Sequence, residues 1–270
     1  MKTLILLIAA TAASLVAQDA SNRVTVPFSD PNRPRTVRAH MINGCVTVEG
    51  YDGKDVIIEP RAGGDSEERP RHTPRGAEGL KRIEPQGLGL NVEEENNVIT
   101  IHGSPSRSNN LLVRVPVNTS VKLECMNGGA ITVNRVTGDL ELQNLNGAVE
   151  ANNVSGTVIA HSLNGEVHIS MDRVTPDKPM SFSSMNGNID VSLPAGTRGN
   201  IHMKSDNGDV YSDFDVKLGG ASSPVVEDGR SKGGKYKIKI DRTTNGTING
   251  GGPDLTFKTF NGNIYIRQKK

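Results

Sequence analysis

Glu150, His168 and Asp190 are the residues whose types and spacing could do chemistry. Each follows an Asn-Gly pair at the same short interval, so a chain wound in regular coils would place all three in one column. Two carboxylates beside an imidazole could act as general acid and base or hold a metal ion. A solvated outer face, where polar side chains occur by default, explains the same pattern. Because Tyr211 occupies the equivalent position on a later copy, the sequence favours the outer face.

Sequence motifs of common enzyme classes are absent from the chain. It has no Gly-x-Ser-x-Gly elbow, no His-Glu-x-x-His helix, no Cys-x-x-Cys pair and no phosphate-binding glycine loop. Asp213 and Asp215 are too few carboxylates for a dedicated calcium site, and the six histidines are dispersed. We therefore expect a protein that is not an enzyme and that uses no cofactor and no metal.

The two cysteines, Cys45 and Cys125, allow one disulfide if the chain is exported. The alternative is two small buried residues in strands. Cys125 stands two residues before an Asn-Gly pair, where other copies have Ser, Thr or Asn. It therefore most simply replaces a Ser, and the pairing stays open.

Eight Asn-Gly pairs, aligned by their asparagines, set the period of the chain. Three residues after most of these asparagines stands Val or Ile, a second apolar residue commonly follows two later, and a polar residue lies between them. This alternation is typical of a strand with one buried face. The residue before Asn is often large and apolar, so Leu163 is expected in or near the core. The pairs are Asn43-Gly44, Asn127-Gly128, Asn146-Gly147, Asn164-Gly165, Asn186-Gly187, Asn207-Gly208, Asn245-Gly246 and Asn261-Gly262.

Two all-β architectures fit this period of about 18 to 22 residues. In an antiparallel hairpin meander, each Asn-Gly closes one hairpin. In a β-solenoid, the coils stack and equivalent side chains form columns about 4.8 Å apart. The meander explains each turn but does not require the same residue type at aligned positions. Because a stack does require it, we favour the solenoid.

The run "LLVRVPVNTSVKLECMNGGAITV", at 111–133, and the recurrent Asn-Gly-x-Ile/Val-x-Val resemble the DUF4097 family. The similarity extends over residues 35–267 and is strongest at 111–216. It implies an exported bacterial protein with a repetitive β-solenoid-like domain, in a family regarded as candidate adhesins. The resemblance supplies no catalytic residues.

The N-terminus predicts export. Lys2 precedes a short apolar run that ends in small residues, which is typical of a secretory signal peptide cleaved after Ala17. No later apolar run is long enough to span a membrane, so we expect no transmembrane segment in the mature chain. The expected organisation is a signal peptide (1–17), a polar leader (18–34), a repetitive β domain (35–267) with a mobile loop (61–90) and a Gly/Ser-rich insertion (219–234), and a solvated basic tail (268–270).

The net charge limits the classes of partner that can be expected. The chain has 31 basic and 30 acidic residues, so its formal net charge is +1. This balance gives no electrostatic case for nucleic acid. We predict an exported, non-catalytic binding or scaffold protein of the cell envelope, located in the periplasm, at the cell surface or outside the cell, whose partner is an unknown envelope protein or polysaccharide. One alternative is a solenoid carbohydrate-active enzyme that uses the Glu150, His168 and Asp190 face. Another is an envelope-stress or regulatory partner protein that binds through 61–90 or 219–234.

Overall fold

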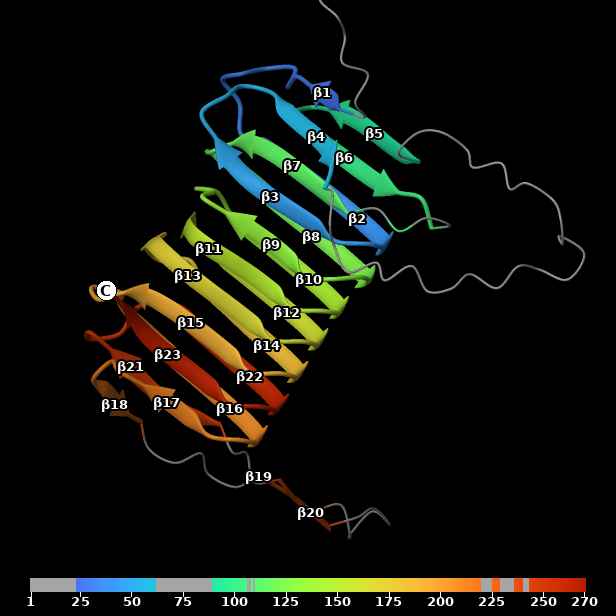
Figure 1. Cartoon of the computed structure of the whole chain (residues 1–270). Coiled ribbons are helices and arrows are strands. Elements are labelled where there is room, and N and C mark those ends of the chain that lie inside the picture. Colours follow the sequence, from blue (N-terminus) through green and yellow to red (C-terminus); the bar gives the residue numbers. More distant parts are fainter. Residues whose placement is uncertain are drawn as a thin grey trace, which may run out of the picture.

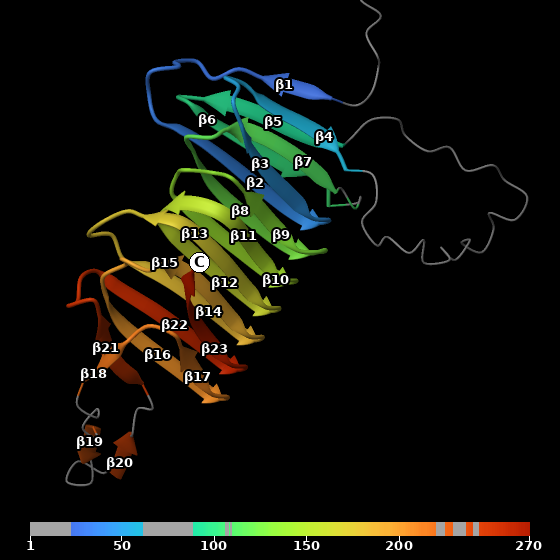
Figure 2. The same ribbon diagram turned by 60° about the vertical axis from the view of Figure 1, so that its left-hand side comes forward.

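A computed structural model describes residues 23–61, 89–105, 108, 110–219, 225–228, 236–239 and 243–270. These residues form strands and turns and include no helix, so none of them makes a helix that could cross a membrane. Two large sheets face each other across one apolar core. The coils stack along the length of the molecule (Figures 1 and 2).

The two large sheets each have their own order of strands in space. From one edge to the other, sheet A contains β1 (Val24–Val26), β4 (Val56–Pro60), β7 (Leu111–Pro116), β3 (Val46–Tyr51), β9 (Ile131–Asn134), β11 (Val149–Gly156), β13 (Val167–Val174), β15 (Ile189–Pro194), β23 (Ile264–Lys269) and β17 (Val210–Ser212). Sheet B contains β18 (Val216–Leu218), β21 (Thr244–Ile248), β16 (Gly199–Asn207), β22 (Asp254–Asn261), β14 (Met180–Asn186), β12 (Val158–Asn164), β10 (Leu140–Asn146), β8 (Thr119–Asn127), β2 (Arg35–Asn43), β6 (Val98–Gly103) and β5 (Leu90–Glu95). A separate antiparallel pair joins β19 (Val225–Asp228) and β20 (Tyr236–Lys239).

Parallel pairing between coils confirms the solenoid and makes the hairpin meander wrong. Strand β10 pairs in parallel with β8 on one side and β12 on the other. Strand β11, which follows β10 after an Asn-Gly turn, lies in the other sheet and pairs in parallel with β9 and β13. Each Asn-Gly pair therefore carries the chain from sheet B to sheet A, and Asn146 lies beside Asn127.

Period-two alternation fills the space between the sheets. Leu140 and Leu142 of β10 point inward and are buried, as are Val149 and Ala151 of β11. Most inward residues are Val, Ile, Leu and Ala, and a thin core of this kind suits a chain with 3% aromatic residues. One aromatic pair in the core, Phe182 and Phe257, stacks at 5.2 Å between ring centroids.

The order of the coils in space differs from their order along the chain. The last coil, β22 and β23, lies between the coil of β14 and β15 and the coil of β16 and β17. Strand β22 pairs in parallel with β14 and with β16. The repeat does not encode this order, because every coil presents the same columns to its neighbours.

Strands occur in three of the segments expected beside or within the repetitive domain. Strand β1 falls inside the expected polar leader and pairs with β4. Strand β19 falls inside the expected insertion. Lys269 belongs to β23, and its ammonium contacts Asp172, so the end of the chain is not simply a solvated tail. The expected signal peptide and residues 62–88 of the expected loop lie outside the described residues.

Candidate functional site

The Asn-Gly edge is the edge of the solenoid where the strands of sheet B end and the chain crosses to sheet A. Seven of the eight predicted asparagines lie side by side there, in the order Asn43, Asn127, Asn146, Asn164, Asn186, Asn261 and Asn207. From Asn127 to Asn207, each side-chain amide donates to or accepts from its neighbour at 2.7–3.1 Å. The asparagines thus form a ladder that joins coil to coil.

The glycines of this edge are required by close approach of the backbone. A Cβ atom on Gly165 would lie 2.3 Å from the carbonyl oxygen of Gly147, and one on Gly187 would lie 2.2 Å from that of Gly165. Both distances are far inside van der Waals contact. Neighbouring turns are therefore packed backbone to backbone, which any larger residue would prevent.

The column of small polar residues is buried. Ser162 is fully buried, and its hydroxyl donates to the carbonyl oxygen of Gly147 in the preceding coil at 2.9 Å. Ser184 makes the same bond to Gly165. These bonds satisfy turn carbonyls that would otherwise be buried without a partner.

The large apolar column is exposed, so the prediction that Leu163 lies in or near the core is wrong. Leu163 is half-buried, and the equivalent Leu145 is 37% exposed. The inward alternation of Leu140 and Leu142 continues through Asn144, which turns the next residue outward. Counting in steps of two from the inward residues Leu140 and Leu142 would have predicted from the sequence that this column faces outward.

Asn245 and Gly246 do not form a repeat turn, and the prediction for this copy is wrong. Both lie inside β21, which pairs antiparallel with β16. The Asn245 amide oxygen contacts His202 Nδ1 at 2.8 Å. The same dipeptide therefore also occurs inside a strand that is paired on both sides, with β16 and with β18.

Both cysteines are free thiols in the structure. Cys125 is 3% exposed, and burial raises the pKa of its thiol to about 12. Burial also raises the pKa of the Cys45 thiol, which donates to the Asn110 side-chain oxygen at 3.2 Å. Neither thiol has the low pKa of a reactive cysteine.

The outer column of sheet A brings Glu150, His168 and Asp190 together in adjacent strands. The Arg267 Nε–H donates one bifurcated hydrogen bond to the two Asp190 carboxylate oxygens, at 2.9 and 3.1 Å, which raises the pKa of that guanidinium. Two tyrosines continue the column, stacked at 5.3 Å between ring centroids: Tyr265 and Tyr211. Across the described part of the chain, no group of three or more His, Cys, Asp or Glu residues is arranged to hold a metal ion.

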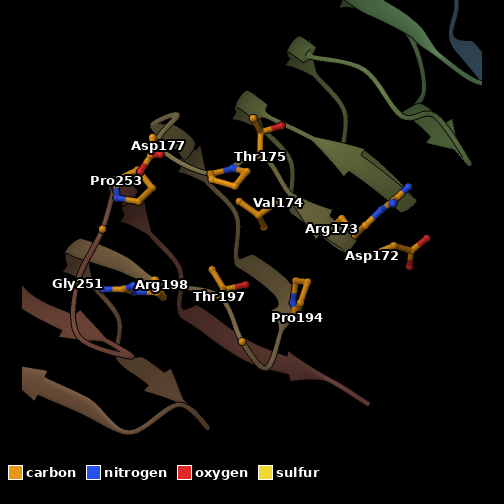
Figure 3. Close-up of a pocket in the computed structure, with 13 residues that line it drawn as sticks. Asp172, Arg173, Val174, Thr175, Asp177, Pro194, Thr197, Arg198, Gly251 and Pro253 are labelled. Carbon is orange, nitrogen blue, oxygen red and sulfur yellow. The ribbon is translucent and has the colours of Figure 1, made fainter.

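The loop edge lies opposite the Asn-Gly edge and contains a cleft that sequence reasoning missed (Figure 3). Three connections line it: the one after β13, the one after β15 and the one before β22. Its volume is about 600 Å³. The side chains that form its walls include Thr175, Asp177, Pro194, Thr197, Arg198 and Pro253. Three turns that are distant in sequence therefore make one concave surface.

Thr197 is the most informative residue of this cleft. It is 6% exposed, and its hydroxyl has no hydrogen-bond partner in the described structure. The surrounding loop is held firmly, because the Asn249 amide donates to the carbonyl oxygens of Ala195 and Thr197 at 2.9 and 2.7 Å. Arg198 and Asp177 are exposed at the same cleft. The cleft thus offers a cation and an anion beside apolar proline rings, and the Thr197 hydroxyl oxygen is buried in its wall.

Comparison with known proteins supports the predicted family over part of the chain. Residues 135–249 match the family model Toastrack DUF4097, which confirms the resemblance there. A "putative cell adhesion protein" from Clostridium sporogenes shares 12% identity at a TM-score of 0.38, over 92% of this chain and 99% of that one. A "putative adhesin" from Bacteroides fragilis shares 11% identity at a TM-score of 0.31, over 92% and 97%. No curated protein matches. The described residues form an all-β, solenoid-like stack, and residues 135–249 of it carry the Toastrack DUF4097 match.

Proposed function

We propose that the protein is an exported, non-catalytic binding or scaffold protein of the cell envelope, of the adhesin type, and that the loop-edge cleft binds its ligand. The unpartnered Thr197 hydroxyl carries this proposal. Burying a hydroxyl without a hydrogen bond costs about 1–3 kcal/mol, and such groups commonly mark sites where a ligand or water supplies the partner. The rigid stack then presents the cleft to an envelope protein or polysaccharide.

Export rests on the apolar, small-residue N-terminus of the sequence. The solenoid-enzyme alternative is weakened by the pairing of Asp190 with Arg267, because both carboxylate oxygens already accept from that guanidinium. The regulatory-partner alternative places binding on segments that lie mostly outside the described residues. The loop-edge cleft, whose lining residues are all described, therefore supports the binding proposal.

Co-sedimentation with isolated bacterial envelope tests the proposal. Arg198→Glu and Thr197→Val should each reduce the bound fraction several-fold, because they remove a cation and a hydroxyl from the cleft. Lys54→Glu is the matched control, since Lys54 is exposed near the other end of the stack and makes the same charge change. Binding that is equal in all four proteins would place the ligand elsewhere, and no binding by the unmodified protein would contradict an envelope role.

A further inference from the structure

An exposed apolar ridge runs across the outer face of sheet B, next to the asparagine ladder. Four of its side chains are 37–47% exposed, and the fifth, Leu163, is half-buried. They stand on five adjacent strands at the same register and so span about 19 Å in a straight line. We call these residues the apolar ridge: Met126, Leu145, Leu163, Met185 and Phe260.

The ridge is not required by the fold. The equivalent position on β16 is Asp206, which shows that a coil can stack with a charged residue there. Ile159, on the central strand β12, is 46% exposed on the same face and widens the apolar surface. Contiguous exposed apolar residues with a polar surround mark interaction surfaces.

We propose that the occupant of this face is a second copy of the chain, related by a two-fold axis that runs along β12. Such a rotation keeps the rows of the sheet and reverses the order of the strands. Leu163 then meets Leu163 of the second copy, and Ile159 meets Ile159. Met126 on β8 meets Phe260 on β22, and Leu145 on β10 meets Met185 on β14. Every ridge residue obtains an apolar partner.

One pair of charges beside the ridge fits the same symmetry. In the next outward row, Glu124 stands on β8 and Lys258 on β22, two strands away from β12 on opposite sides. The rotation therefore places Glu124 against Lys258 of the second copy, twice in each dimer. Between them stand Gln143, His161 and Ser183, so Gln143 faces Ser183 of the second copy and His161 faces its own counterpart on the axis. Glu124 already contacts Lys122 of its own chain at 3.4 Å, and a carboxylate can accept from a second cation.

The area of the outer face of sheet B determines how strong a dimer is expected. Seven strands and three outward rows cover roughly 500 Å² of each copy, or about 1,000 Å² in total. That area is at the low end for specific interfaces, so the dimer should be weak and should form as concentration rises. Complementary charge at both ends fixes the register of the two copies.

Sedimentation velocity over a concentration series up to about millimolar tests the dimer. Leu163→Asp places two carboxylates on the axis and should weaken dimerisation at least tenfold. Leu218→Asp is the matched control, since Leu218 is 68% exposed on β18 and lies outside the ridge. A monomer at every concentration would overturn the proposal, as would a dimer that Leu163→Asp leaves intact. A monomer whose envelope binding depends on Leu163 would assign the ridge to a different macromolecule.

A mixing experiment tests the symmetry itself. Glu124→Lys and Lys258→Glu should each weaken the homodimer, because each places like charges opposite one another. An equimolar mixture should restore dimers, since both contacts then join opposite charges. If both single variants dimerise as well as the unmodified protein, or if the mixture stays monomeric, the two-fold arrangement along β12 is wrong.

Discussion

At the Asn-Gly edge, seven coils turn with the same side chains, whereas at the loop edge most connections differ in length and sequence, and only those at Gly138 and Gly156 share a Val-x-Gly turn. The difference follows from what each turn touches. An Asn-Gly turn packs backbone to backbone on its neighbours and bonds to them through Asn and Ser side chains. A change in one such turn therefore disturbs two others. At the loop edge, the turns at Gly138 and Gly156 are packed in the same way, whereas the three connections that form the cleft differ in length and sequence.

The largest expected difference between the edges comes from two glycines. Gly165→Ala should lower the free energy of unfolding by about 3 kcal/mol or more, because its Cβ would lie 2.3 Å from a backbone oxygen. Gly196→Ala, in the loop edge, should change it by less than about 1 kcal/mol, since no atom lies within 4 Å of the new Cβ. Denaturant titration of both variants measures the difference. Similar losses would show that the turns of the Asn-Gly edge are not tightly packed.

Ser162→Ala should lower the free energy of unfolding by about 1–2 kcal/mol, because it leaves the buried Gly147 carbonyl oxygen without its donor. Ser170→Ala, on the half-exposed outer side of β13, is the matched control and should be nearly neutral. Equal changes in the free energy of unfolding of the two variants would show that the hydrogen bonds of the buried polar column do not stabilise the fold.

The Cys125 thiol should resist thiolate-selective reagents in the folded protein at pH 8 and react when the protein is unfolded. Its pKa is raised to about 12 by burial, whereas an unfolded cysteine titrates near 8.5. The folded state thus keeps a proton that the unfolded state releases, so the stability linked to this thiol is present below about pH 8.5 and is lost as pH rises toward 12. Fast labelling of the native thiol would show that this column is open.

The smallest loss of stability is expected at the loop edge, for Thr197→Val. The change should raise the free energy of unfolding, by up to about 1–3 kcal/mol, because it removes a buried hydroxyl that has no partner. The contrast with Ser162 is sharp, since both hydroxyls are buried and only one is bonded. Thermal unfolding of the two variants measures it. A loss at Thr197 as large as at Ser162 would mean that a partner holds its hydroxyl.

The repeat in the sequence was enough to predict the solenoid, since seven aligned asparagines require a shared environment. It could not place Leu163, because a large apolar residue before the turn suits a core position by type alone. Only the phase inherited from Leu140 and Leu142 shows that this column faces outward. Asn245 repeats the turn sequence within a strand, so the dipeptide was not sufficient evidence for a turn.

The cleft could not be predicted for a different reason. It needs residues 251–253 beside 172–177 and 194–198, and these meet because β22 inserts between β14 and β16. No local pattern reports that insertion. Thr197 also carries no signal in the sequence, because an unpartnered hydroxyl is a property of the packed structure.

The central claim is that the loop edge binds the ligand, whereas the Asn-Gly edge joins the coils to one another. Amide hydrogen exchange at fixed protein concentration, with and without solubilised envelope extract, tests this claim most directly. The account predicts slower exchange in 172–177, 194–198 and 251–253 when the extract is present, with unchanged exchange in the Asn-Gly turns. Protection confined to the Asn-Gly turns or to the outer face of sheet A, with no change in these three loops, would contradict it.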